Sequence, residues 1–277
     1  MRSQVVRNVS PQTYEGFELR FIPEGGVLAA AVVLGATLSS VQPAASQACA
    51  QETVQGADYV VCTLEPDNVD LRLFWKSADD KPYRYFSSVA EAVRAEGRTL
   101  VFAVNAGMYQ TDFSPIGLYV EAGRLLRPAS VGKAPASTGS VPNFYKTPNG
   151  VFFIGETGAG ILPTNAFLKR RPLVRLATQS GPMLVIGNRL NPIFVAGSTD
   201  RTRRSGVGVC SDRTVRFAIS EGMVNFHDFA QLFRDHLKCE DALFLDGGRG
   251  VGLYNPTMGR NDLSWHGGFG PIFGVVE

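Results

Sequence analysis

Short apolar segments separated by glycine- or asparagine-containing turns recur along most of this 277-residue chain. Several neighbouring segments are separated by only a few residues. The pairs are 118–120 with 124–126, 151–154 with 161–162, and 207–210 with 215–219. Closely spaced apolar segments of this kind are typical of antiparallel β-hairpins. The sequence therefore predicts a mixed, largely antiparallel sheet.

Two stretches have the pattern of α-helices instead. Residues 88–91 read Ser-Val-Ala-Glu, a capping box that predicts a helix starting there and ending before Gly97. Residues 225–238 are the clearest helical segment, with Asn225 as a good N-cap. Its apolar face consists of Phe226, Phe229, Ala230, Phe233 and Leu237. Because hairpins outnumber helices, the predicted fold class is α+β, a mixed, largely antiparallel sheet with a few packed helices in a single domain.

The N-terminal region contains an uninterrupted run of apolar and small residues, 27–38. A membrane-spanning helix needs about 20 residues, whereas the core of a secretory signal peptide needs about 7 to 15. Small residues follow, and Ala44 and Ser46 suit signal peptidase. We predict a signal peptide over 1–46, with an atypical N-terminal extension, and an exported periplasmic or extracellular domain over 47–277 without a membrane span. An uncleaved anchor and a buried helix are the alternatives.

The chain contains four cysteines: Cys49, Cys62, Cys210 and Cys239. None forms a C-x-x-C pair, and their spacing does not resemble a zinc site. An even number in an exported chain indicates two disulfides, with free buried thiols as the alternative. Cys49–Cys62 would close a short loop and leave Cys210–Cys239 as the second bridge. This is the pairing predicted here among those that four cysteines allow.

Charge and histidine content limit the classes of partner and cofactor. The formal net charge is +2, and no long run of one sign occurs, so nucleic acid is not an expected partner. Only three histidines occur, without the H-x-H or H-x-x-x-H spacing of metal sites. A metal-dependent phosphodiesterase or nuclease is therefore disfavoured. Neither a metal nor a cofactor is predicted.

Three segments place a polar residue beside glycine at the end of an apolar strand or at a tight turn. They are Asn105-Ala106-Gly107, Gln179-Ser180-Gly181-Pro182 and Asp246-Gly247-Gly248. Glycine lets the backbone come close to a ligand, and a carboxylate at the end of a rigid strand is held in place. One such segment alone is more often an ordinary turn, so only the set indicates a site.

The order of these segments, together with two further motifs, resembles a known family. The motifs are Asn149-Gly150-Val151-Phe152 and Arg203-Arg204-Ser205-Gly206. With the runs VNAGMY, SPIGLYVE, ATQSGPMLV and ALFLDGG, the chain is similar to the phosphodiester glycosidase domain, above all to its exported bacterial members, over about residues 58–276. One departure follows the Asp-Gly pair, where the family often has a serine and this chain has Arg249 and Gly250.

The resemblance implies hydrolysis of a sugar-1-phosphodiester, such as an N-acetylglucosamine-1-phosphodiester, to the free sugar and a phosphomonoester. Asp246 is the candidate carboxylate that would stabilise or attack the anomeric centre, or activate water. Asn105, Arg203 and Arg204 complete the predicted catalytic set, because a guanidinium pairs well with phosphate oxygens. On an extended segment only one of the two arginines is expected to face the site. The predicted substrate-binding residues are Gly107, Tyr109, Asn149, Ser180, Gly181, Gly247, Gly248 and His266.

The expected partner is thus a small-molecule or glycan sugar-phosphate substrate. A second reading is a non-catalytic module that binds cell-envelope glycans. The altered loop at Arg249 and Gly250 keeps that reading open, and binding without turnover would favour it.

Overall fold

The computed structural model describes residues 47–132, 134 and 141–277, so the predicted signal segment lies outside the described residues. The described chain forms three sheets and three short α-helices, and neighbouring strands are antiparallel throughout. This confirms the predicted α+β class. None of the helices in the described part is long and apolar enough to cross a membrane.

The largest sheet has seven strands in the order β1-β2-β13-β12-β14-β10-β11. They are β1 (Gln47–Val54), β2 (Ala57–Leu64), β10 (Met183–Ile186), β11 (Arg189–Leu190), β12 (Arg204–Cys210), β13 (Val215–Ser220) and β14 (Cys239–Gly247). The segment between Ala242 and Leu245 is fully buried, as its apolar sequence predicts. β14 lies between β12 and β10, and its carboxyl end carries Asp246.

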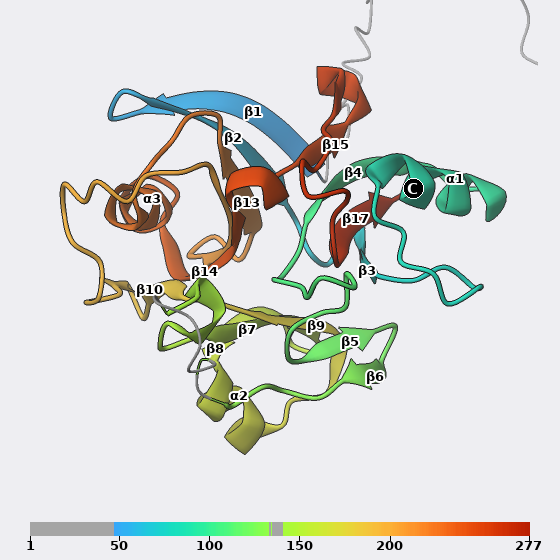
Figure 1. Ribbon diagram of the computed structural model, residues 1–277, viewed down its shortest axis with the longest axis horizontal. Coiled ribbons are helices and arrows are strands. Elements are labelled where there is room, and N and C mark those ends of the chain that lie inside the picture. The colour runs from blue at the N-terminus through green and yellow to red at the C-terminus, as the bar shows by residue number, and fades with distance from the viewer. Residues whose placement is uncertain (1–46, 133, 135–140) are drawn as a thin grey trace, which may run out of the picture. The chain divides into compact units, whose positions relative to one another are not determined.

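Two five-stranded sheets complete the framework (Figure 1). The second sheet runs β16-β15-β4-β17-β3 and consists of β3 (Asp70–Phe74), β4 (Leu100–Asn105), β15 (Leu253–Asn255), β16 (Arg260–Asn261) and β17 (Ile272–Val276). The third runs β6-β5-β9-β7-β8 and consists of β5 (Tyr119–Glu121), β6 (Arg124–Arg127), β7 (Gly150–Gly155), β8 (Gly158–Pro163) and β9 (Val174–Ser180). The predicted hairpins at 118–126 and 151–162 are confirmed as β5–β6 and β7–β8.

One aromatic cluster joins the three sheets. Phe217 on β13 of the first sheet lies 5.1 Å from Phe273 on β17 of the second, measured between ring centroids. Phe152 on β7 of the third sheet lies 5.4 Å from Phe273 and 6.3 Å from Phe217. All three rings are at most 1% exposed. Because each sheet contributes one ring to the same buried cluster, the sheets share a single core.

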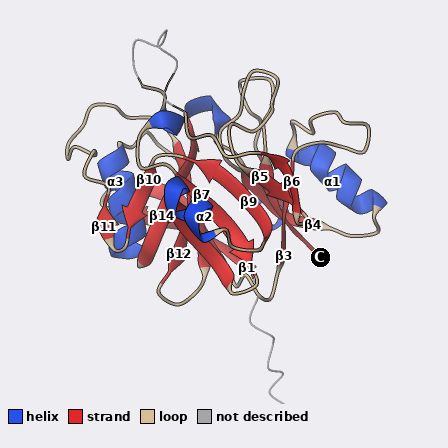
Figure 2. Ribbon diagram, turned by 90° about the horizontal axis from the view of Figure 1, so that it is seen from below, coloured by secondary structure: helices blue, strands red, loops and turns tan. Residues whose placement is uncertain are grey.

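The helices lie around the strands rather than between them (Figure 2). α1 (Phe86–Ala95) packs beside β4, α2 (Thr164–Arg170) beside β8, and α3 (Phe226–Gln231) beside β10. Asn225 is the N-cap of α3, and its Oδ1 accepts the Asp228 N–H over 2.8 Å, as predicted. The predicted continuation of this helix is a π-helical turn, Leu232–His236.

The capping-box prediction is wrong for α1. The helix begins at Phe86, and its N-cap Tyr85 makes no side-chain capping bond. Phe86 is buried against Phe269, with ring centroids 4.4 Å apart, so tertiary packing rather than a local cap fixes the start. The predicted end is confirmed, because Gly97 has the positive φ of 77° that glycine adopts without steric cost.

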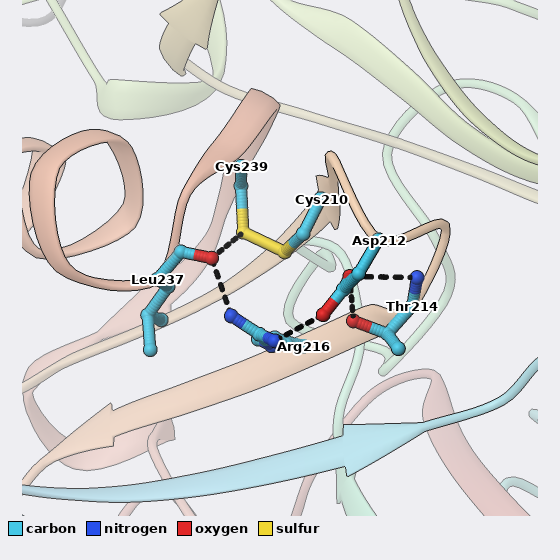
Figure 3. The surroundings of a disulfide bond; sticks show 6 residues. All are labelled: Cys210, Asp212, Thr214, Arg216, Leu237 and Cys239. Carbon is cyan, nitrogen blue, oxygen red and sulfur yellow. Dashed lines mark hydrogen bonds and ion pairs between the residues drawn. A yellow bond between two sulfur atoms is a disulfide. The ribbon is translucent and has the colours of Figure 1, made fainter.

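Both predicted disulfides are present. Cys49 and Cys62 are opposite each other on the paired strands β1 and β2. Cys210, the last residue of β12, is bonded to Cys239, the first residue of β14 (Figure 3). Each bond joins neighbouring strands, and the second one ties the two strands that carry Ser205 and Asp246 nearer their other ends.

Candidate active site

A buried serine connects the end of β4 to the end of β14. Asn105, the last residue of β4, donates from Nδ2 to Ser205 Oγ over 2.8 Å. Ser205 on β12 donates to the Asp246 carbonyl over 3.1 Å, and its Oγ accepts the Asp246 N–H over 3.2 Å. Asn105 and Ser205 are 2% and 0% exposed. The first and third predicted segments are therefore held side by side, although they belong to different sheets.

The second predicted segment reaches the same place from the third sheet. Ser180, the last residue of β9, is fully buried and donates to the Leu245 carbonyl over 2.9 Å. Its neighbour Gln179 holds a different part of the chain, because its Oε1 accepts the N–H groups of Leu118 and Ser130 at 3.0 and 2.9 Å. Strand ends from all three sheets thus converge on the last residues of β14.

The Asp246 carboxylate is closely surrounded by protein. Its Oδ1 accepts the Gly247 N–H over 2.8 Å, and a Cβ placed on Gly250 would lie only 2.2 Å from its Oδ2. Desolvation raises the pKa of this carboxyl from 3.8 to about 6, although the Gly247 bond opposes part of the rise. The residue nevertheless keeps some exposed surface, because it lines a cavity. Gly250, part of the departure from the family pattern, therefore makes room for the carboxylate.

The cavity beside Asp246 has a volume of about 470 Å³. Its wall brings together the predicted residues Asp246, Tyr109 and His266 with an aromatic and apolar lining. The lining also includes Met108, Gln110, Thr111, Phe113, Ile116, Pro142, Phe144 and Tyr145. A largely apolar cavity with a few convergent polar groups is the usual form of a small-molecule site.

Tyr109 is fixed in this cavity by two glycines. Its hydroxyl donates to the Gly268 carbonyl over 3.1 Å, and a Cβ on Gly270 would approach the Tyr109 Cγ to 2.3 Å. Burial, and then the negative charge of Asp246, raise the pKa of the Tyr109 phenol from its ordinary value. The phenol therefore stays protonated at neutral pH, and its proton is directed to the Gly268 carbonyl.

Several predicted binding residues support the wall rather than line the cavity. Asn149 donates from Nδ2 to the Phe144 carbonyl over 3.1 Å and thereby holds the 3-10 turn Asn143–Tyr145. Gly181 lies against Asn149, and an added Cβ would come within 2.6 Å of the Asn149 Cβ. Gly107 lies against the Gln179 carbonyl, at 2.6 Å from a hypothetical Cβ. These glycines allow the close backbone approach that brings the segments together.

Gly247 and Gly248 continue the turn after Asp246. Gly247 donates to the Asp246 carboxylate, and Gly248 donates to the Arg203 carbonyl over 2.8 Å with a φ of 61°. This positive φ is unfavourable for residues with a side chain. The turn therefore fixes the carboxylate relative to the start of β12.

The two arginines make different contacts, and neither lines the Asp246 cavity, although one of them was expected to face the site. The Arg204 guanidinium is 1% exposed, lies 3.6 Å above the Phe226 ring and donates to the carbonyls of Val224 and Asp200 at 2.9 and 3.1 Å. Burial lowers its pKa to about 10. Two of its donor atoms thus bond within the protein, its guanidinium stacks on Phe226, and Arg204 does not line the Asp246 cavity.

Arg203 is more exposed but also lies outside the wall of this cavity. Its Nε donates to the Ser220 carbonyl over 3.3 Å, and its Nη2 lies 4.0 Å from Glu221 Oε1. Its side chain is 33% exposed, and the main role visible in the structure is that of its carbonyl, which accepts the Gly248 N–H. The predicted phosphate contact of Arg203 thus remains a prediction.

Sequence reasoning missed some of the residues that build the site. Ser205 links Asn105 to Asp246, yet a single serine after two arginines carries no sequence signal of this role. Phe144 and Tyr145 follow a segment rich in Pro, Gly, Ser and Thr, where no helix or strand pattern marks them as part of a site. Over the described residues, no cluster of three or more His, Cys, Asp or Glu side chains is arranged to hold a metal ion.

The buried amide of Asn105 leads to a stability prediction. Asn105→Ala would remove the donor to Ser205 and the Oδ1 that accepts the Gly252 N–H over 3.2 Å. A buried group left without its partner costs about 1 to 3 kcal/mol, so we expect the free energy of unfolding to fall by about 2 kcal/mol. Urea unfolding measures this. Asn68→Ala, at an exposed position, is the control and should change it by less than about 0.5 kcal/mol. An equal effect of the two substitutions would contradict the prediction.

The sequence is similar to those of known proteins. The family model for phosphodiester glycosidase matches residues 98–271. An Escherichia coli (strain K12) protein, uncharacterized protein YigE, is 28% identical over 185 residues, which cover 67% of this chain and 70% of that protein.

Two solved structures share the fold. One is the catalytic domain of zebrafish N-acetylglucosamine-1-phosphodiester alpha-N-acetylglucosaminidase, with a TM-score of 0.56, 12% identity and coverage of 83% of this chain and 81% of that one. The other is a hypothetical protein from Synechocystis, with a TM-score of 0.54, 14% identity and coverage of 82% and 61%. At these identities the likeness concerns the fold alone. Since the family model covers more than half of the sequence, including Asn105, Ser180 and Asp246, the chain belongs to the phosphodiester glycosidase family.

Proposed function

We propose that this protein is an exported hydrolase that cleaves a sugar-1-phosphodiester, with N-acetylglucosamine as the model sugar, into the free sugar and a phosphomonoester. The observation that carries the proposal is the Asp246 carboxylate, which is desolvated, fixed at a strand end and placed on the wall of a cavity of about 470 Å³. Family membership supports a glycosidase-type reaction. Two disulfides are consistent with export, because such bonds persist in oxidising compartments.

The proposed chemistry breaks the bond between the anomeric carbon and the bridging oxygen. The electron pair of that bond stays on the bridging oxygen, which departs as part of the phosphomonoester. Water supplies the oxygen that the anomeric carbon gains, and one water proton goes to solvent or to the phosphate. Since phosphate is a good leaving group, the main demand on the protein is to stabilise positive charge at the sugar.

Asp246 is suited to that demand. With a pKa of about 6 its carboxyl is ionised at neutral pH, and its poor hydration leaves the negative charge available to the anomeric centre. Its link to Asn105 through Ser205 restrains the backbone behind it. Tyr109 and His266 line the same cavity and would contact the sugar or the phosphate.

Hydrolysis in oxygen-18 water tests the proposal. The substrate is methyl N-acetyl-α-glucosaminyl phosphate, and mass spectrometry of the products locates the label. We expect it in the sugar, because the anomeric carbon–oxygen bond breaks. Label in the phosphate would mean a phosphodiesterase, and binding of the substrate without release of either product would favour the glycan-binding alternative.

A further inference from the structure

A second cavity of about 460 Å³ adjoins the Asp246 cavity. The two share Tyr145, the last residue of the 3-10 turn Asn143–Tyr145. Phe144, one residue before it, lines only the Asp246 cavity, and Lys146, one residue after it, lines only the second cavity. A single turn therefore separates two compartments of similar size, and a ligand that passes Tyr145 would occupy both.

Apolar side chains dominate the second cavity. Phe194 and Phe226 stack at its base with ring centroids 5.0 Å apart and an interplanar angle of 3°. Ile193 and Val195, on either side of Phe194, are 45% and 69% exposed. Aliphatic side chains gathered at a cavity instead of being scattered over the surface indicate a binding site for an apolar group.

One cation of the second cavity directly follows the turn that borders both cavities. Lys146 Nζ lies 5.2 Å from the centroid of the Phe226 ring, and it makes no ion pair within 4.0 Å among residues 47–132 and 141–277. Burial lowers the pKa of this amine, against the attraction of the Asp200 carboxylate in the same cavity, and the charge of Arg204 lowers it further to a lesser degree. An anion placed beside Lys146 would favour the charged ammonium, which burial disfavours.

We propose that the second cavity binds an alkyl aglycone of the phosphodiester, with Lys146 paired to the phosphate and the sugar in the Asp246 cavity. The inference rests on the proposed function and specifies its substrate class. The two linings suit the parts of such a substrate: a carboxylate in one cavity for the sugar, and a lysine beside apolar side chains in the other for the phosphate and the alkyl group. The other cation near this wall, Arg204, is 1% exposed and already donates to two carbonyls, so Lys146 carries the phosphate contact.

A binding experiment tests the cavity without turnover. Octyl phosphate and methyl phosphate, the expected products, are titrated into the protein by calorimetry, with octyl phosphate kept below the concentration at which it aggregates. Burial of one methylene strengthens binding by a factor of about 4, and a half-open cavity gives less, so we expect octyl phosphate to bind at least about tenfold more tightly. Equal affinity for the two compounds would overturn the inference.

Variants locate the effect. Ile193→Ser combined with Val195→Ser should remove most of the octyl preference, whereas Leu125→Ser, at a 62% exposed leucine on β6, should leave it intact. Lys146→Met should weaken the binding of octyl phosphate by a factor on the order of 5 to 10. Lys169→Met, which replaces an exposed lysine on α2, should leave that affinity unchanged. Loss of the preference in the Leu125 variant, or its persistence in the double variant, would refute this placement.

Kinetics separate the inference from the function on which it rests. We expect kcat/KM for the octyl phosphodiester of N-acetylglucosamine to exceed that for the methyl diester at least about tenfold, mainly through KM, because uniform binding lowers KM. Turnover of both diesters at equal kcat/KM would sink the aglycone inference and leave the proposed function standing. Failure to hydrolyse either diester would sink the proposed function and the aglycone assignment with it.

Discussion

Asp246→Asn is expected to slow hydrolysis of a sugar-1-phosphodiester by a factor on the order of 100 or more, equivalent to about 2.7 kcal/mol of activation free energy. The amide has nearly the shape of the carboxylate and keeps an oxygen for the Gly247 N–H. It lacks the negative charge that faces the anomeric centre in the proposed mechanism. The loss should therefore appear in kcat, while KM changes little, because sugar and phosphate contacts remain. Steady-state kinetics with the methyl diester measure both.

The same substitution should not destabilise the fold. Because the folded-state pKa is raised, the carboxyl group favours the folded state below its unfolded pKa of 3.8, and this contribution is lost as the pH rises to about 6. The Asn variant has no such loss. Its stability relative to the wild type should increase between pH 4 and pH 6 and stay higher by on the order of 2 kcal/mol at neutral pH, as thermal melting at the two pH values would show.

Asp241→Asn is the matched control. Asp241 lies on the same strand, accepts the Gly187 N–H over 3.0 Å, and has a pKa that burial raises, but it does not line the Asp246 cavity. Its replacement should leave kcat within about twofold of the wild type. Near wild-type turnover in a folded Asp246→Asn protein would show that Asp246 is only a turn residue.

Much of the local structure around this residue could be predicted. The apolar run before Asp246 and the two glycines after it indicated a buried strand that ends at a carboxylate, and β14 has this form. The hairpins followed from short apolar segments beside turn residues, and Asn225 acted as a cap because its side chain bonds locally. These predictions succeeded because the interactions that decide them lie within a few residues in the sequence.

Features that depend on distant parts of the chain could not be predicted in the same way. β9 ends in Thr178, Gln179 and Ser180, which are at most 1% exposed, and a polar sequence gives no sign of a buried strand. These side chains are tolerated because other segments supply their hydrogen bonds, as the Leu245 carbonyl does for Ser180. Arg204 is a second example of a buried polar side chain that could not be predicted. It was expected near phosphate, but its guanidinium is buried over Phe226.

Loss of the Cys210–Cys239 disulfide is expected to lower stability and to leave activity nearly unchanged. Asp246→Asn is expected to do the opposite. The bond closes a loop with a sequence separation of 29, for which the chain-entropy model gives a stabilisation of about 3 to 4 kcal/mol. In a domain of this size that corresponds to a fall in Tm of roughly 10 °C for Cys210→Ser combined with Cys239→Ser. Cys49→Ser combined with Cys62→Ser opens a loop of separation 13 at an edge strand and should cost somewhat less.

Activity should survive the loss of that bond. Cys210 and Cys239 are paired at one end of β12 and β14, whereas Ser205 and Asp246 are paired near the other, roughly 17 Å away at about 3.3 Å per strand residue. Hydrogen bonds of Arg216 to the Leu237 carbonyl and to Asp212 still hold the cysteine end together (Figure 3). At a temperature well below its Tm, the double-serine variant should therefore retain kcat within about twofold. If kcat fell in parallel with stability, the position of Asp246 would depend on the disulfide at the other end of β12 and β14. The hydrogen bonds of Asp246 to Ser205 and Gly247 would then be insufficient to hold it in place.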